Sequence, residues 1–238
     1  MANILVVGKD LPESENLIKS FELQGHKVFT TANSDFSIDS ESIFAFSWNK
    51  ASSISAKTLL VQAESKLQQI DRVLIIFDGP AYSTKFESDR IEDCTQAVEH
   101  MISSYIYFCQ TLVSRLAQKP HKVTIGFYLK NVATKADLAT TKSGTQTPCS
   151  NCVSTAQGAF LSMAENFGIT FYQLDQVSVF LCQSDISNEL YTNEKDTGAW
   201  ILSYFDAEDN LKQRQSAKQS LSWVKVGGKM PGSFSLFK

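Results

Sequence analysis

The chain has 238 residues, with 22 Lys and Arg against 25 Asp and Glu, which gives a net charge of −3. Its 43% hydrophobic and 11% aromatic residues, with only 11 Gly and 5 Pro, exclude a disordered, linker-dominated or collagen-like chain. The slight negative charge argues against a nucleic-acid or anionic-membrane surface, because phosphate groups are bound by clustered positive charge. The length fits one α/β domain or two small ones.

Short apolar segments alternate along the chain with segments whose apolar residues recur at helical spacing. Strands are predicted where apolar residues run consecutively, as they do in strands covered on both faces. These strands are Ile4–Gly8, Lys27–Thr31, Ile43–Trp48, Arg72–Phe77, Lys122–Tyr128, Thr170–Leu174 and Ser222–Val226. Helices are predicted between them, over Ser14–Gln24, Ser55–Gln69, Asp89–Gln118 and Cys152–Phe167.

This alternation predicts right-handed crossovers and a doubly wound, Rossmann-like α/β fold with seven mostly parallel strands. The sequence shows no internal repeat and no interdomain linker, so a single domain over residues 1–238 is expected. Residues 133–151 are rich in Thr, Ser and Lys and predict a long, exposed, flexible loop.

Neither a signal peptide nor a membrane span is predicted. The first strand begins directly after Met1–Asn3, without a basic region or a long apolar region before it. The longest apolar runs are far shorter than a membrane span. These features predict a cytoplasmic protein.

The five cysteines predict neither a metal site nor a redox site. Cys94, Cys109 and Cys182 lie in apolar or helical surroundings, which favours buried thiols. Cys149 and Cys152 form a C-x-x-C, but the chain has no second C-x-x-C or H-x3-H to complete a zinc site. The motif also does not follow the first strand, as it does in thioredoxin-like proteins, and we interpret both residues as loop cysteines.

Four segments resemble motifs of the short-chain dehydrogenase/reductase family, in the same order along the chain. Ile4–Gly8, with the helix and strand after it, resembles the first βαβ half, and Asp71–Pro80 resembles the strand written D-x-L-V-N-N-A-G. Ala156–Thr170 resembles the catalytic helix and next strand, S-K-x-A-L…A-x-E…G-I-x-V, and Val224–Gly228 resembles the C-terminal V-D-G-G. The resemblance covers nearly the whole chain and implies the Rossmann-like fold of that family.

The resemblance also locates the positions where the family binds NAD or NADP. The family has several glycines in its first strand–helix turn, where the backbone approaches the pyrophosphate. Here only Gly8 remains, and Asp10 places a negative charge where phosphates would lie. The ribose and adenine positions fall at Asn33 and Asn49, and the glycine of N-N-A-G is Gly79. We expect these positions to be vestigial and no cofactor to bind.

The catalytic positions implied by the resemblance hold residues that cannot perform the family's proton transfer. The family uses a Tyr, a Lys four residues later, a Ser, and an Asn on a helix. Their places fall at Val153, at Gln157, at Phe127 or Tyr128, and near Ser103. Gln157 carries no charge that could lower the pKa of a neighbouring tyrosine. The resemblance therefore implies a catalytic set that has been lost.

Two further features suggest a functional site but also have simpler interpretations. Tyr191–Lys195 reads Y-x-x-x-K, but it follows the predicted sixth strand, and we interpret it as a surface tyrosine and a solvated lysine. Asp78, Tyr128 and Asp175 are predicted at the carboxyl ends of neighbouring strands, where open α/β sheets bind ligands. They predict a remodelled pocket for an unidentified small molecule, or else they are turn residues.

Two hypotheses for function remain open from the sequence. The first is a pseudoenzyme, a non-catalytic or repurposed ligand-binding or interaction protein with the short-chain dehydrogenase fold. The second is an NAD(P)-dependent oxidoreductase that uses non-standard residues.

In proteins of this fold two long helices often pair between subunits. The long helix 89–118 is apolar on more than one face, so a homodimer or homotetramer through it and helix 152–167 is predicted.

Overall fold

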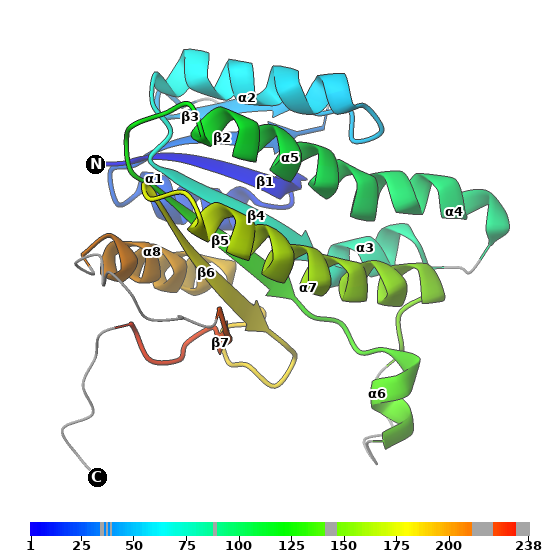
Figure 1. The fold of residues 1–238 in the computed structure, drawn as a ribbon. Coiled ribbons are helices and arrows are strands. Elements are labelled where there is room, and N and C mark those ends of the chain that lie inside the picture. Colours follow the sequence, from blue (N-terminus) through cyan, green and yellow to red (C-terminus); the bar gives the residue numbers. More distant parts are fainter. Residues whose placement is uncertain are drawn as a thin grey trace, which may run out of the picture.

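A computed structural model describes residues 1–33, 36, 38, 40–87, 90–140, 147–210 and 221–231. The described residues form a seven-stranded, entirely parallel sheet with the order β3-β2-β1-β4-β5-β6-β7 (Figure 1). Its strands are β1 (Asn3–Leu11), β2 (Lys27–Ala32), β3 (Ile43–Ser47), β4 (Arg72–Asp78), β5 (Val123–Lys130), β6 (Val177–Ser184) and β7 (Trp223–Lys225). The predicted fold class is confirmed.

Helices cover both faces of the sheet, as the right-handed crossovers require. They are α1 (Glu15–Glu22), α2 (Ser53–Leu67), α3 (Gly79–Lys85), α4 (Ile91–Val98), the π-helical η1 (Glu99–Ser103), α5 (Ser104–Leu116), α6 (Lys135–Thr140), α7 (Asn151–Tyr172) and α8 (Glu194–Asn210). The helices α2, α5 and α7 pack on one face, and α1 and α8 pack on the other (Figure 1). Every residue of β4 is buried, which explains its unbroken apolar pattern.

The predicted strand Thr170–Leu174 is wrong, because α7 continues through Tyr172 and the sixth strand is β6. Gly168, expected to end the helix, lies inside it. A Cβ atom at Gly168 would stand 2.8 Å from the Leu221 side chain, so close packing is the reason for this glycine. The helix α8 was not predicted, and its buried residues cover the second face of the sheet.

The long helix predicted over 89–118 is confirmed between Ile91 and Leu116, as α4, η1 and α5. The predicted loop over 133–151 is partly wrong, because Lys135–Thr140 forms α6 and Asn151 begins α7. Residues 141–146 of that loop lie outside the described residues. Within the part of the chain that the structure describes, no helix is both long and apolar enough to cross a bilayer.

Candidate functional site

The carboxyl edge of the sheet is the candidate site, because open α/β sheets bind their ligands there. The strands β1, β4 and β5 bring Lys9, Asp78 and Lys130 to this edge, and α8 adds its first residue, Glu194. Lys9 Nζ lies 2.7 Å from Asp78 Oδ2 and is also paired with Glu194, while Lys130 Nζ lies 3.3 Å from Glu194 Oε1. We call these four residues the edge cluster.

Lys9 and Asp78 of the edge cluster are buried, Lys130 and Glu194 are partly buried, and the four charges balance. The side chains of Lys9 and Asp78 are only 7% and 4% exposed, and two ammonium groups face two carboxylates. Burial works to lower the pKa of Lys9, but the attraction and hydrogen bonds of Asp78 and Glu194 outweigh it and raise that pKa. Lys9 is therefore held as a cation against the carboxylates, at the carboxyl end of β1.

A second buried ion pair lies beside the edge cluster, on the β2 and β3 side. Lys50 follows β3 and places its Nζ 2.7 Å from Asp10 Oδ2, and the Thr31 hydroxyl donates to Asp10 Oδ1 at 2.6 Å. Burial works to raise the pKa of Asp10, but Lys50 and Thr31 lower it. Lys50 Nζ also lies 5.9 Å from the ring centres of Trp48 and Tyr82. The carboxylate expected to repel phosphate is thus neutralised within the protein.

Gly8 lies within β1 at an irregularity, where the register against β2 shifts between Val6 and Leu11. Its φ is +101°, and a Cβ atom there would stand 2.0 Å from the carbonyl oxygen of Ile76. The Tyr105 hydroxyl donates to that same oxygen at 2.6 Å and lies 2.9 Å from the Tyr82 hydroxyl. Burial raises the pKa of both tyrosines, so they are held as neutral hydroxyls. The backbone at Gly8 is therefore contacted by two buried tyrosine hydroxyls of the protein itself.

Two asparagines and a glycine hold the other positions implied for the cofactor. Asn33 and Asn49 are exposed, and the Asn49 side chain accepts from the Ala51 backbone N–H at 3.1 Å, as in a turn. Gly79 is buried, and a Cβ atom there would stand 2.8 Å from the carbonyl oxygen of Lys130. Gly79 therefore serves the close approach of β4 to β5.

The positions implied for catalysis are likewise occupied by structural groups. The Gln157 amide accepts from the Val132 backbone N–H at 3.0 Å and donates to the Val132 carbonyl at 3.3 Å. Val153 is fully buried, and Ser103 lies half-buried in η1. The side chains of Val153 and Gln157 therefore do not supply the family's proton transfer.

The serine position expected at Phe127 or Tyr128 does not lie at the strand end, because β5 continues to Lys130. Tyr128 is 3% exposed and its hydroxyl lies 2.8 Å from Ser184 Oγ. Burial raises the pKa of Tyr128 well above its ordinary value. Tyr128 is therefore a core residue with a satisfied hydroxyl.

Asp175 must be removed from the predicted pocket, since it precedes β6 and so lies at the amino edge of the sheet. Of the three residues proposed to share a pocket, only Asp78 stands at a strand end on the carboxyl edge. The error follows from the misplaced sixth strand. The same shift means that the residue after the sixth strand is Asp185 and not Asp175.

Tyr191 is not a surface residue, which corrects a second interpretation. It is half-buried, its hydroxyl donates to the Asn131 carbonyl at 2.8 Å, and Lys130 Nζ lies 5.2 Å from its ring centre. Burial, together with Asp78 and Asp185, raises the pKa of Tyr191 to about 12. A catalytic tyrosine of the short-chain dehydrogenases needs a lowered pKa, and the pKa of Tyr191 is raised instead. Lys195 is exposed, as expected.

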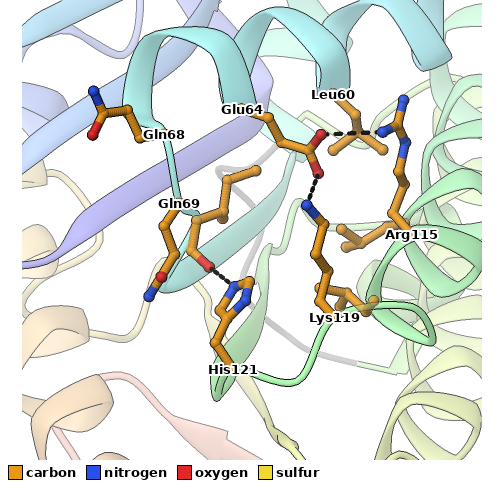
Figure 2. Close-up of a pocket in the computed structure, with 10 residues that line it drawn as sticks. Leu60, Glu64, Gln68, Gln69, Arg115, Lys119 and His121 are labelled. Atoms are coloured by element: carbon orange, nitrogen blue, oxygen red, sulfur yellow. Dashed lines mark hydrogen bonds and ion pairs between the residues drawn. The ribbon is translucent and has the colours of Figure 1, made fainter.

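A hollow at the opposite, amino edge is lined by the ends of α2 and α5 (Figure 2). Its two cationic side chains, Arg115 and Lys119, both face Glu64, at 3.1 and 3.8 Å. His121 Nε2 lies 3.0 Å from the Ile70 carbonyl oxygen (Figure 2). These groups are engaged with one another, and the hollow is not at the ligand-binding edge of the sheet.

Acid should destabilise the protein through His100, which is half-buried with its Nδ1 3.1 Å from Lys85 Nζ. Burial, Lys85 and Lys50 lower the pKa of His100 from 6.5 to about 4. Between these two values the unfolded chain binds more protons than the folded chain, so stability falls as the pH falls. Urea unfolding from pH 7 to pH 4.5 should show this slope.

The variant His100→Gln should make the acid slope shallower, because the glutamine side chain does not titrate in this range. The variant Lys85→Met should bring the pKa of His100 closer to 6.5, because it removes a cation beside the imidazole ring. The pH range over which stability falls should therefore become narrower. An unchanged slope in His100→Gln would contradict the assignment.

Known proteins resemble this chain in their solved structures. No family model and no curated protein matches the sequence. Among solved structures, the chain resembles a short-chain dehydrogenase from Mycobacterium smegmatis, with 11% identity over 96% of this chain and 92% of that one, at a TM-score of 0.65.

Two further solved structures also match the chain at low sequence identity. A short-chain dehydrogenase from Streptomyces avermitilis is 9% identical over 96% of this chain and 89% of its own, at a TM-score of 0.62. The 3-ketoacyl-(acyl-carrier-protein) reductase from Brucella melitensis, solved with NADH, is 13% identical over 77% of this chain and 75% of its own, at a TM-score of 0.56. The protein has the fold of the short-chain dehydrogenases and reductases.

Proposed function

We propose that this protein is a divergent short-chain dehydrogenase/reductase that binds no NAD or NADP and acts as a non-catalytic interaction protein. The observation that carries the proposal is the edge cluster. Lys9, Lys130, Asp78 and Glu194 place a largely buried, charge-balanced network where this fold otherwise receives a dinucleotide. A bound pyrophosphate would have to separate Lys9 from both carboxylates, which would leave buried charges without partners.

The chemistry at the edge supports the same proposal. A reductase of this fold needs a hydroxyl whose proton is transferred near neutral pH. Tyr82, Tyr105, Tyr128 and Tyr191 lie at or near the edge, and burial raises the pKa of each. Fold alone does not establish chemistry, so the matched enzymes do not decide the question.

Calorimetric titration with NADH and NADPH tests the proposal. We expect no saturable heat at millimolar cofactor, corresponding to a Kd weaker than about 1 mM. The Brucella melitensis reductase, solved with NADH, serves as the positive control. Saturable binding of either cofactor, with a matching rise of the thermal unfolding midpoint, would overturn the proposal and favour the oxidoreductase alternative.

We further propose that the interaction surface includes the long helix and pairs the chain with a second copy. Ile91, Val98 and Ile106 are 80%, 47% and 39% exposed, and they recur at spacings of seven and eight residues along α4, η1 and α5. An apolar stripe of this kind is stabilised by burial against a partner. The helix α7, predicted as the second element of the interface, packs against α4 and α5.

Sedimentation velocity should therefore show a homodimer or homotetramer at micromolar concentration. The double variant Val98→Glu/Ile106→Glu should sediment as a monomer, because it places charges on the stripe. Leu23→Glu is the matched control, since Leu23 is 73% exposed but follows α1 on the other face of the sheet. A monomeric wild-type protein would contradict the proposed interface.

A further inference from the structure

The structure places two cysteine thiols against each other that are far apart in the sequence. Cys94 in α4 and Cys152 in the first turn of α7 are separated by 58 positions, and their Sγ atoms lie 3.7 Å apart. Both residues are only half-buried, so Cys94 is not the core thiol expected from its surroundings. The C-x-x-C of the sequence thus has its second cysteine beside a thiol of a different helix.

The other cysteines differ from this pair in burial. Cys109 and Cys182 are fully buried, and burial raises the pKa of both thiols well above the ordinary value. Because the thiolate is the reactive form, a thiol with a raised pKa exchanges disulfides more slowly. Cys149 is 4% exposed, in the segment before α7. The half-buried pair is therefore the most accessible place for thiol chemistry among the five cysteines.

From this juxtaposition we infer that Cys94 and Cys152 form a reversible disulfide that links α4 to α7. A low-molecular-weight disulfide such as oxidised glutathione is the oxidant. The backbone N–H groups of the first turn of α7 favour negative charge on a side chain there, so Cys152 is the attacking group. The two helices already pack together, and the sulfurs need to close only the gap between contact and a covalent bond of about 2.05 Å.

The reaction balances in two exchange steps. The Cys152 thiolate bonds to one sulfur of oxidised glutathione, the disulfide of glutathione breaks, and one reduced glutathione leaves. The Cys94 thiolate then bonds to Cys152 Sγ and expels the second glutathione. In total the two protein thiols lose two electrons and two protons, and oxidised glutathione takes them up to become two thiols.

The disulfide would close a long loop and so restrict the unfolded chain more than the folded one. The oxidised protein should therefore unfold several degrees above the reduced protein, and a reductant such as dithiothreitol should reverse the shift. This inference rests on neither the carboxyl edge nor cofactor binding, but α4 and α7 also belong to the proposed interface between copies.

The test is oxidation of the purified full-length chain with oxidised glutathione, followed by peptide mass mapping without reduction. We expect a cross-link between Cys94 and Cys152 that disappears in Cys94→Ser and in Cys152→Ser. The matched controls Cys149→Ser and Cys109→Ser should keep both the cross-link and the rise in unfolding temperature. Wild-type mapping decides the question even if a serine variant folds poorly.

Four results would overturn the inference: a Cys149–Cys152 disulfide in its place, glutathione adducts without a cross-link, a link between two chains, or thiols that stay reduced.

Discussion

Replacing Lys9 by methionine should lower the free energy of unfolding by about 3–5 kcal/mol, because removing one partner of a buried ion pair leaves the others uncompensated. Lys9 lies between two carboxylates, and Asp78 has 4% of its side chain exposed. Methionine keeps the length of the aliphatic chain, so the loss comes from charge and not from a cavity. Urea unfolding of wild type and Lys9→Met at pH 7 measures the difference.

The control is Lys19→Met, which removes an exposed ion pair with Glu15 on α1 and should leave the unfolding midpoint unchanged. The double variant Lys9→Met/Asp78→Asn should recover at least about 1 kcal/mol of the loss, since asparagine removes the unpaired charge. Asparagine also keeps the helix cap that Asp78 supplies to Ala81 at the start of α3. Equal losses in the single and double variants would contradict the role given to Lys9.

The variant Gly8→Ala should lower the free energy of unfolding by more than about 4 kcal/mol, the range of exceptional single substitutions. The added methyl group would stand 2.0 Å from the Ile76 carbonyl oxygen and 2.9 Å from the Tyr105 hydroxyl. The obstacle is backbone in the centre of the sheet, which cannot rotate away as a side chain can. Circular dichroism should show a fall of roughly 8–16 °C in Tm, or failure to fold.

The matched control for Gly8 is Gly25→Ala. Gly25 also has a positive φ, of +81°, but nothing lies within 4 Å of an added Cβ atom. This variant isolates the conformational strain of an alanine in the left-handed region, roughly 1–2 kcal/mol. If the two variants lost the same stability, the close approach of Gly8 to Ile76 would carry no energetic weight.

Much of the fold could be predicted from the sequence because the sheet is covered on both faces. Six of the seven strands follow from consecutive apolar residues, and β4 is the clearest. The prediction of the sixth strand was wrong because the C-terminal turn of α7 is rich in apolar residues, and because Gly168 resembles a helix stop. Whether a glycine ends a helix or packs within one depends on a tertiary contact, here with Leu221.

Some residues of the candidate site could be predicted from the sequence, and others could not. Asp78 and Gly79 were found because the local pattern of strand and turn identifies the carboxyl end of β4. Lys130 was missed because the end of β5 was placed two residues too early. Glu194 could not be found, since its helix was not predicted and its partner Lys9 lies 185 positions away. Such long-range pairs leave no periodicity in the sequence.

The separation of Lys9 from Glu194 has a consequence for the order in which the chain folds during synthesis. Lys9 emerges from the ribosome early, and Asp78 follows it, but Glu194 becomes available only after more than three quarters of the 238 residues have been made. Domains with such distant pairings must close long loops before the contacts stabilise them. The carboxyl edge therefore reaches charge balance late, so a chain that stops before α8 exposes Lys130 without its carboxylate and leaves the second face of the sheet covered by α1 without α8.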